Sequence, residues 1–131
     1  MLALADDSGL EVDALGGAPG LYSARYGGPG LDDRGRLMKL LDALTGVPDE
    51  RRTARFRAIV AFVDPSGNET VTEGIVEGVI IHAPRGTNGF GYDPIFFYPP
   101  LGRTFAELES RELDQVSHRA RAIRALRRAL P

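Results

Sequence analysis

The sequence predicts one α/β (mixed) domain, in which a mixed central sheet carries a β-hairpin and flanking helices. Three observations support this prediction: an apolar run ending in carboxylates near the start, two adjacent segments that alternate with period two, and two segments with helical apolar spacing. With 131 residues, the chain has the size of a single domain that buries roughly two thirds of its unfolded surface. No internal repeat, low-complexity tract or long linker divides it, so we expect one domain over residues 1–131.

The composition excludes several classes of function. A net charge of -2 gives no overall attraction to nucleic acid or to an anionic membrane, so we expect neither as a partner. No apolar stretch approaches the length of a membrane span, and no basic n-region precedes a cleavage site, so we expect a cytoplasmic protein. The chain has no cysteine, which excludes disulfides, thiolate metal sites and cysteine nucleophiles.

The first element is an apolar run over residues 2–5 that leads into Asp6 and Asp7. This pattern predicts a buried strand that delivers both carboxylates to the carboxyl edge of the sheet, where α/β folds usually bind ligands. Such a strand normally lies in mid-sheet, so we expect its usual preceding partners to be absent from this chain. Residues 10–14 alternate and predict a short second strand, and the glycine-rich residues 16–20 predict a loop.

The next elements are a helix and a hairpin. Asp32 or Asp33 can cap a helix, which Gly46 and Pro48 would end. The apolar residues with helical spacing are Leu37, Leu40, Leu41 and Leu44. Residues 55–63 and 70–81 alternate with period two around the turn-forming residues 64–68, which predicts an antiparallel hairpin. One face of its first strand would carry Phe56, Ala58, Val60 and Phe62.

A short strand over residues 94–98, ended by Pro99, and a last helix complete the predicted fold. Ser117 is a good N-cap for this helix, and Asp114 is the competing choice one turn earlier. The apolar stripe of the helix consists of Val116, Ala120, Ile123, Leu126 and Leu130.

Asp6 and Asp7 are the first candidate functional residues. Phosphoryl chemistry needs hard oxygen ligands for Mg²⁺ and a base that orients water, and adjacent carboxylates can divide these tasks. Because side chains alternate along a strand, we expect only one of the two to point directly into a site. In the alternative interpretation, Asp6 caps a turn and Asp7 is solvated.

The segment of residues 86–93 places aromatic residues between glycines. A base could stack on Phe90 or Tyr92 while Asp93 accepts hydrogen bonds from the base or sugar. The segment is neither a P-loop, because no Gly-Lys-Ser/Thr follows, nor a dinucleotide fingerprint. The alternative is a tight turn that packs its rings into the core.

If Ser117 caps the last helix, His118 and Arg119 lie in the first turn, where free N–H groups and the helix dipole favour an anion. Arg119 can donate to a phosphate or to the oxygen of an oxo-purine. The alternative is a capped surface helix with a solvated arginine. The basic stripe of Arg119, Arg121, Arg124 and Arg128 could also contact RNA, although a solvated helix face is the commoner meaning.

A triad of Ser8, His118 and Asp7 is disfavoured because no Gly-x-Ser-x-Gly elbow surrounds the serine.

Four motifs occur together and in order along nearly the whole chain. They are Ala5-Asp-Asp-Ser-Gly-Leu10, Gly16-Gly-Ala-Pro-Gly20 followed by Ser23-Ala-Arg-Tyr26, Gly89-Phe-Gly-Tyr-Asp-Pro-Ile-Phe-Phe97, and Ser117-His-Arg119. This combination closely resembles the inosine triphosphate pyrophosphatase family. The resemblance implies that family's fold and a Mg²⁺-dependent homodimer that hydrolyses ITP, dITP and XTP to the monophosphate and pyrophosphate.

The resemblance also implies roles for individual residues. Asp7 would be a metal ligand and the proton acceptor, and Asp6 its acidic neighbour at the metal. The substrate contacts would be Ser8, Phe90, Gly91, Tyr92, Asp93, His118 and Arg119. Phe90 would stack on the base. Arg119 would favour a 6-oxo group, because a guanidinium can only donate hydrogen bonds.

The chain departs from that family in two ways. The family begins with a strand and a Thr/Ser-Gly-Asn-x-x-Lys loop that grips the triphosphate, and we expect this segment to be absent here. Leu113 occupies the position of a lysine that usually precedes the Ser-His-Arg motif, and Lys39 is the only lysine of the chain. We therefore expect weakened hydrolysis; the alternative is a non-catalytic remnant that binds purine nucleotides or only dimerises.

Overall fold

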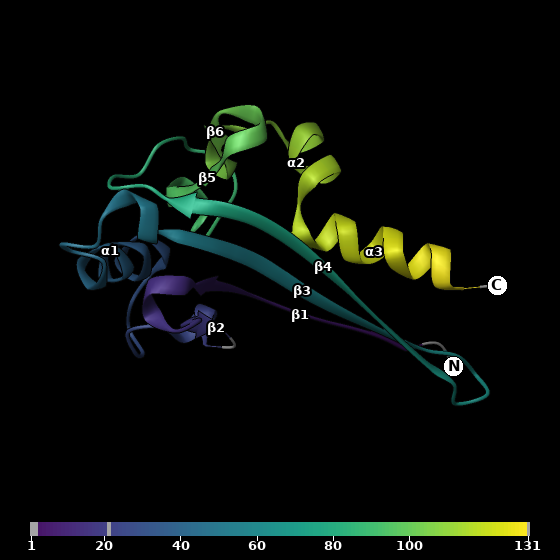
Figure 1. The fold of residues 1–131 in the computed structure, drawn as a ribbon. Coiled ribbons are helices and arrows are strands. Elements are labelled where there is room, and N and C mark those ends of the chain that lie inside the picture. Colours follow the sequence, from purple (N-terminus) through teal and green to yellow (C-terminus); the bar gives the residue numbers. More distant parts are fainter. Residues whose placement is uncertain (1–2, 21, 131) are drawn as a thin grey trace.

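The computed structural model describes residues 3–20 and 22–130, with side chains from Asp7 onward. A six-stranded sheet with the order β2-β1-β3-β4-β5-β6 forms the centre of the fold (Figure 1). Its strands are β1 (Ala3–Val12), β2 (Pro19–Gly20), β3 (Thr53–Val63), β4 (Glu69–Ile80), β5 (Phe96–Tyr98) and β6 (Arg103–Thr104). The helices are α1 (Asp33–Ala43), α2 (Ser110–Val116) and α3 (His118–Ala129).

The predicted α/β class with a hairpin and flanking helices is confirmed. The sheet differs in one respect, because every described pair of neighbouring strands is antiparallel where we expected a mixed sheet. Short connections reverse the chain between β3 and β4 and between β5 and β6, whereas a parallel pair would need a long crossover.

Strand β1 is one continuous strand of ten residues, not two. Asp6 and Asp7 therefore lie inside it, paired with Val60 and Ile59 of β3, and the prediction that they follow the end of a strand is wrong. A tertiary contact explains the glycine that follows Ser8. Gly9 allows the backbone of Gly20 to approach, because a Cβ at position 9 would overlap the Gly20 carbonyl.

Helix α1 begins and ends as predicted. The side chain of Asp32 caps it by accepting a hydrogen bond from the Gly35 amide at 2.7 Å. After the helix, Gly46 adopts a left-handed conformation with φ +82°. Leu40 and Leu44 are completely buried against the sheet, so the apolar stripe of α1 faces the core.

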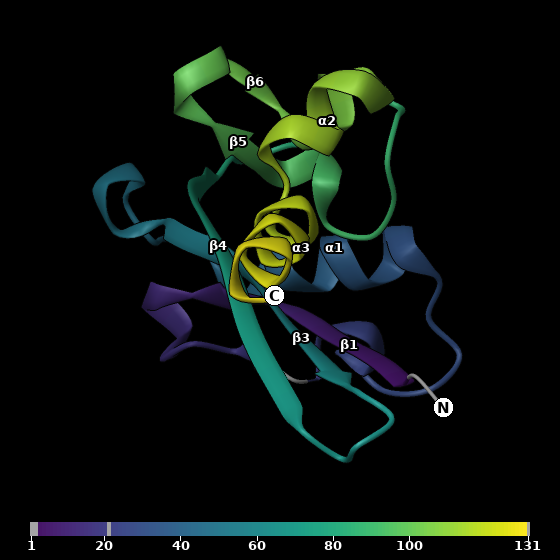
Figure 2. The same ribbon diagram turned by 90° about the vertical axis from the view of Figure 1, so that its right-hand side faces the viewer.

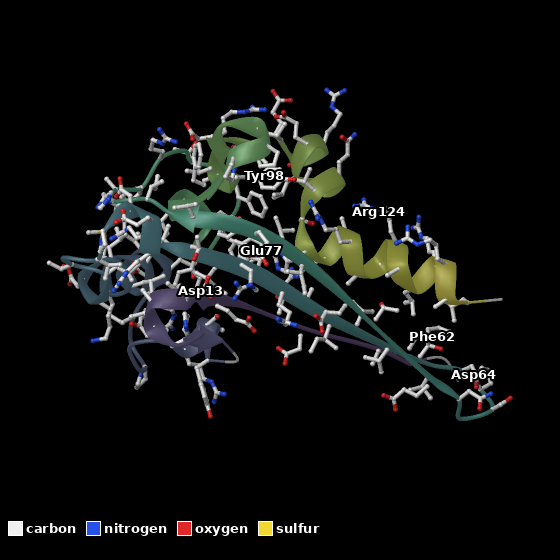
Figure 3. All side chains as sticks on the ribbon, in the orientation of Figure 1. Asp13, Phe62, Asp64, Glu77, Tyr98 and Arg124 are labelled. Carbon is white, nitrogen blue, oxygen red and sulfur yellow. The ribbon has the colours of Figure 1, made fainter. Side chains whose placement is uncertain are left out.

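The predicted hairpin is confirmed as β3 and β4. Asp64 organises its turn by accepting hydrogen bonds from the amides of Ser66 at 2.8 Å and Asn68 at 3.0 Å, and it lies at the far tip of the molecule (Figure 3). Ala58 and Val60 of β3 are fully buried, as the alternation predicts. The segment of residues 94–98 is shorter as a strand than predicted, because Asp93–Ile95 forms a 3-10 turn before β5 begins.

The two faces of the sheet differ in character. The face under α1 and α3 is apolar and includes a group of packed rings, Phe56, Phe96, Phe105 and Tyr98. On the opposite face, Arg55 forms ion pairs with Asp13 at 3.0 Å and with Glu77 at 3.1 Å; Figure 3 labels the two acidic residues. This alternation between the faces determines which side chains of β1 can reach the apolar side.

Helix α3 packs against β3 and β4, as its end-on view in Figure 2 shows. A glycine makes this contact close, because a Cβ at Gly74 would overlap the His118 carbonyl oxygen and the Ala122 amide nitrogen. The helix is capped by Ser117, whose hydroxyl accepts a hydrogen bond from the Ala120 amide at 3.1 Å. The competing cap at Asp114 is wrong, since this residue lies within α2.

Candidate nucleotide site

A cavity of about 760 Å³ lies between β1, the loop before β5, and helices α2 and α3. Seven of the residues predicted to bind substrate line it: Ser8, Phe90, Gly91, Tyr92, Asp93, His118 and Arg119. Three segments that lie far apart in the sequence thus meet at one cavity. The cavity is also lined by charged residues that the sequence analysis did not assign to a nucleotide site, namely Asp33, Arg36, Asp114, Arg124 and Arg127.

Strand β1 contributes Ser8, whose hydroxyl accepts a hydrogen bond from the Arg119 guanidinium at 3.3 Å. Leu10, which also lines the cavity, is buried and donates its amide to the Ser23 hydroxyl at 2.9 Å. Ser23 in turn donates to the Gly20 carbonyl at 2.7 Å. These bonds fix the segment after β2 against the strand and close one wall of the cavity.

The loop before β5 presents one aromatic ring and buries the other. Phe90 is 65% exposed at the cavity, whereas Tyr92 is 6% exposed and its hydroxyl donates to the Ser23 carbonyl at 2.6 Å. Asp93, 7% exposed, accepts a hydrogen bond from the Phe90 amide at 3.1 Å. The loop is therefore neither a plain surface turn nor one that packs both rings into the core.

The first turn of α3 brings two further side chains to the cavity. The Arg119 guanidinium lies 5.6 Å from the centroid of the Phe90 ring, within the range of a cation–π contact. His118 is half-buried and stacks on Phe56, and its Nδ1 has no hydrogen-bond partner among the described residues. Burial, assisted by the neighbouring charge of Arg119, lowers the pKa of His118 to about 4. The imidazole is therefore neutral at neutral pH.

The electrostatics of the cavity favour an anion. Four arginines and three aspartates line it. The pKa of Asp93 is raised to about 6, mainly by burial and to a lesser extent by the carboxylate of Asp33, while the Phe90 amide and the charge of Arg119 act in the opposite direction. Asp93 is thus mostly ionised at neutral pH and can accept hydrogen bonds from a ligand, while the guanidinium groups can only donate.

Asp7 does not line this cavity. Its exposed side chain borders a separate depression of about 50 Å³, together with Glu11 and Arg57. Ser8 and Gly9 line both hollows, which lie on opposite sides of β1 because side chains alternate along a strand.

The backbone of Asp6 pairs with Val60, and the Asp6 side chain lies outside the described part of the structure.

The side chains that the structure describes do not form a complete metal site. Among them, no group of three histidine, aspartate or glutamate residues could hold a metal ion. Glu11, beside Asp7, is occupied by an ion pair with Arg57 at 3.0 Å. Mg²⁺ usually binds one or two carboxylates together with waters and substrate phosphates, so Asp7 fits a site that is shared with a nucleotide. The assignment of Asp6 and Asp7 as metal ligands stays a prediction.

Some cavity residues could have been found from the sequence and others could not. Arg124 and Arg127 follow Ala120 at helical spacing, which places all three on the cavity side of α3. Asp33 and Arg36 reach the cavity from α1 through tertiary contacts, for which the local sequence holds no signal. The basic stripe is not one solvated face, because Arg121 donates to the Val116 carbonyl at 2.9 Å and to the Tyr98 hydroxyl at 3.1 Å.

Comparison with known proteins agrees with this arrangement. The model of the Ham1 family matches residues 1–129. The chain belongs to the Ham1 family. A curated Ham1 relative, the dITP/XTP pyrophosphatase of Thermus thermophilus, is 55% identical over 124 residues, covering 95% of this chain and 59% of the relative. The dITP/XTP pyrophosphatase of Desulforamulus reducens is 53% identical over 123 residues, covering 94% of this chain and 61% of the relative. The predicted resemblance is thereby confirmed.

Solved structures show the same fold. The Ham1 protein of Staphylococcus aureus superposes with a TM-score of 0.92 at 43% identity, covering 98% of this chain and 66% of that one. A nucleoside-triphosphatase, dITP/XTP pyrophosphatase, of Mycobacterium abscessus superposes with a TM-score of 0.82 at 51% identity, covering 96% of this chain and 66% of that one. This Ham1 chain spans about 60% of the length of its curated relatives. None of its described helices is long and apolar enough to cross a membrane.

Proposed function

We propose that this Ham1 chain hydrolyses the deaminated purine nucleoside triphosphates ITP, dITP and XTP to the monophosphate and pyrophosphate. The observation that carries the proposal is the convergence of Phe90, Asp93 and Arg119 from two distant segments on one cavity. An exposed ring, a carboxylate and a guanidinium are the groups that a purine base requires for stacking and edge recognition. The names of the curated relatives point to the same substrates.

Base selection follows from hydrogen-bonding capacity. A purine that stacks on Phe90 would present its six-membered ring to the guanidinium of Arg119, which lies over the same phenyl ring. Since a guanidinium can only donate, it matches the 6-oxo group of hypoxanthine or xanthine. The 6-amino group of adenine would leave this donor unmatched in a partly desolvated site, which disfavours ATP.

The phosphates would extend from the cavity past Ser8 and Gly9 and around the edge of β1 toward Asp7, because these two residues line both hollows. Asp7 would accept the proton of the water that attacks at the α–β bridge, and pyrophosphate would leave. Mg²⁺ held by Asp7 with Asp6 as its acidic neighbour would neutralise phosphate charge. Arg124 and Arg127 at the cavity wall add positive charge for the same purpose. With Leu113 at the lysine position, we expect hydrolysis to be weak.

A second candidate function is purine-nucleotide binding without catalysis. It is favoured by the position of Asp7, which lies outside the cavity that holds the other predicted residues. Turnover of ITP and ATP by the unmodified chain, by Asp7→Asn, and by a matched control, Asp42→Asn, separates the two functions. Asp42 is an exposed carboxylate on α1. Catalysis predicts faster turnover of ITP than of ATP, and its loss only in Asp7→Asn. Binding of IMP without any turnover of ITP would support the non-catalytic function.

We also propose that the chain forms a homodimer, as the family resemblance implies, and that it is cytoplasmic. Strand β1 pairs with β2 only at Leu10 and Glu11. Among the described residues, the edge of β1 from Ala3 to Ser8 therefore has no strand partner on the side of β2. A second copy could bind to this edge. Light scattering over a wide concentration range tests this point. A monomer at all concentrations would contradict it.

A further inference from the structure

Two carboxylates from different segments hold the loop that carries Phe90. The Phe90 amide donates to Asp93 Oδ2 at 3.1 Å, and the next amide, that of Gly91, donates to Asp33 Oδ2 at 3.1 Å. Asp93 belongs to the loop itself, whereas Asp33 is the first residue of α1, 58 positions away in the sequence. Of these two carboxylates, Asp33 is therefore the one that ties the loop to a separate element of the fold.

These two bonds fix the direction of one side chain. The amides of Phe90 and Gly91 stand on the two sides of the Phe90 Cα, so holding both restricts the φ and ψ angles of Phe90 together. The loop needs such a restraint, because Gly89 and Gly91 on either side adopt positive φ values of +72° and +62°. Glycine permits many other conformations, and the exposed Phe90 ring makes little packing contact that would select one.

We propose that Asp33 is a positioning residue for the base-stacking platform: its carboxylate holds the Gly91 amide so that the Phe90 ring stays directed into the cavity. This inference rests on the proposed function of the cavity as a purine site. Asp33 lines the cavity beside Phe90 but acts through the loop backbone. A platform that is ordered before the ligand arrives binds a base more tightly, because less conformational entropy is lost on binding.

A purely structural role for Asp33 makes a different prediction. An acidic residue in the first turn stabilises a helix through its negative charge at the positive end of the dipole. That role needs the charge, whereas positioning needs an oxygen that accepts a hydrogen bond. Asp33→Asn removes the charge and retains an acceptor oxygen, and Asp33→Ala removes both. The two variants therefore separate the two roles.

The first measurement concerns the loop without any ligand. We expect amide hydrogen exchange at Gly91, followed by NMR, to be roughly tenfold faster in Asp33→Ala and nearly unchanged in Asp33→Asn. The matched control is Asp42→Ala, which removes an exposed carboxylate from the last turn of the same helix. Thermal unfolding of each variant shows whether α1 remains folded. Unaltered exchange at Gly91 in Asp33→Ala would overturn the proposal.

The second measurement is the affinity for IMP by calorimetry. We expect Asp33→Ala to bind IMP roughly five- to tenfold more weakly, and Asp33→Asn and Asp42→Ala to stay within about twofold of the parent. Equal losses in Asp33→Asn and Asp33→Ala would show that the charge matters and would overturn the positioning role. If the unmodified chain failed to bind IMP, the proposed function would fall, while the exchange data would still decide whether Asp33 holds the loop.

Discussion

The imidazole of His118 stacks on the ring of Phe56, with centroids 4.7 Å apart and planes inclined by 12°. His118 is the first residue of α3, and Phe56 is a core residue of β3 that also borders the cavity. A charged imidazolium in this position would be poorly solvated, which is why burial lowers the pKa of His118 to about 4. This environment therefore favours the neutral form of the ring.

This relationship predicts a dependence of stability on pH. The folded chain protonates His118 only near pH 4, whereas an unfolded chain protonates it near its ordinary value of 6.5. Between these values the unfolded state binds more protons than the folded state. The stability that neutral His118 contributes is therefore fully present above about pH 6.5 and is lost as the pH falls toward 4. The shift corresponds to roughly 3 kcal/mol in the free energy of unfolding.

Asp93 has the opposite effect in nearly the same range. Burial raises its pKa from an ordinary 3.8 to about 6, so the folded state binds more protons than the unfolded state between these values. Its contribution makes the fold most stable below about pH 4 and less stable as the pH rises through 6, again by roughly 3 kcal/mol. The two effects partly cancel in the unmodified chain.

Variants at the two positions should reveal these opposed contributions. In Asp93→Asn we expect a stability that rises more steeply from pH 4 to 6.5 than in the parent, because only His118 remains. In His118→Phe, which keeps an aromatic ring against Phe56, stability should rise less steeply or fall over the same range. Urea unfolding at four pH values measures both slopes. The comparison between variants removes the slope that other carboxylates, such as Asp13, add to all of them. Identical slopes in the three proteins would refute the assignment.

We expect substitution of Arg52 to lower the free energy of unfolding strongly, for a reason unrelated to the cavity. It is 3% exposed, and its guanidinium donates to the carbonyls of Ile80 at 2.8 Å, Leu44 at 3.0 Å and Ile81 at 3.1 Å. These bonds join the segment after α1 to the end of β4. We expect Arg52→Met to lose on the order of 3 kcal/mol, since buried carbonyls would lose their donors.

Urea unfolding tests the prediction for Arg52. Arg52→Lys should lose nearly as much, because one ammonium cannot replace a planar group with donors in three directions. The neighbouring Arg51 is exposed, and Arg51→Met should change stability by less than about 0.5 kcal/mol. A similar small change in Arg52→Met would show that the carbonyls find other donors.

The elements that could be predicted from the sequence are those with local determinants. Helix α1 has its cap at Asp32 and its stop at Gly46, and the hairpin has its period-two pattern and its turn at Asp64. Strand β1 could not be predicted to continue through Gly9. The reason for this glycine is the nearby backbone of Gly20, eleven residues later, which no local pattern reveals.

The same distinction applies to the candidate site. Ser8, Phe90 and Arg119 lie within recognisable motifs, and the structure brings these three residues together at one cavity. Asp33 lies outside these motifs. Its contribution is a single hydrogen bond to a distant amide, which no local pattern reveals. The alternation of β1 predicts that Asp7 and Ser8 point to opposite sides, but only the packing of α3 shows that the cavity lies on the side of Ser8.

Gly74 connects the packing of α3 with the cavity. A methyl group at this position would overlap backbone atoms of His118 and Ala122, which cannot move aside as a flexible side chain could. We expect Gly74→Ala to lose about 1 to 3 kcal/mol of stability and to weaken IMP binding, since the first turn of α3 carries Arg119. Val71→Ala, at an exposed position of the same strand, is the control and should leave IMP binding unchanged. Urea unfolding and calorimetry would contradict the prediction if Gly74→Ala behaved like this control.

Substitution of Leu113 tests whether weak binding of the phosphates limits activity. This residue of α2 packs partly on the core and also lines the cavity, so a longer side chain can extend its end into that space. Leu113→Lys adds an ammonium, and we expect the specificity constant for ITP to rise on the order of tenfold, as one added charge-assisted hydrogen bond allows.

Leu113→Met fills a similar volume without charge and should leave the specificity constant near that of the parent. The ratio of specificity constants for ITP and ATP distinguishes phosphate binding from base binding. Both substrates carry the same triphosphate, so a lysine that contacts phosphate should raise the two constants equally and leave the ratio unchanged. A change in the ratio would place position 113 near the base instead. An unchanged constant for both substrates would show that an ammonium at this position does not reach the phosphates.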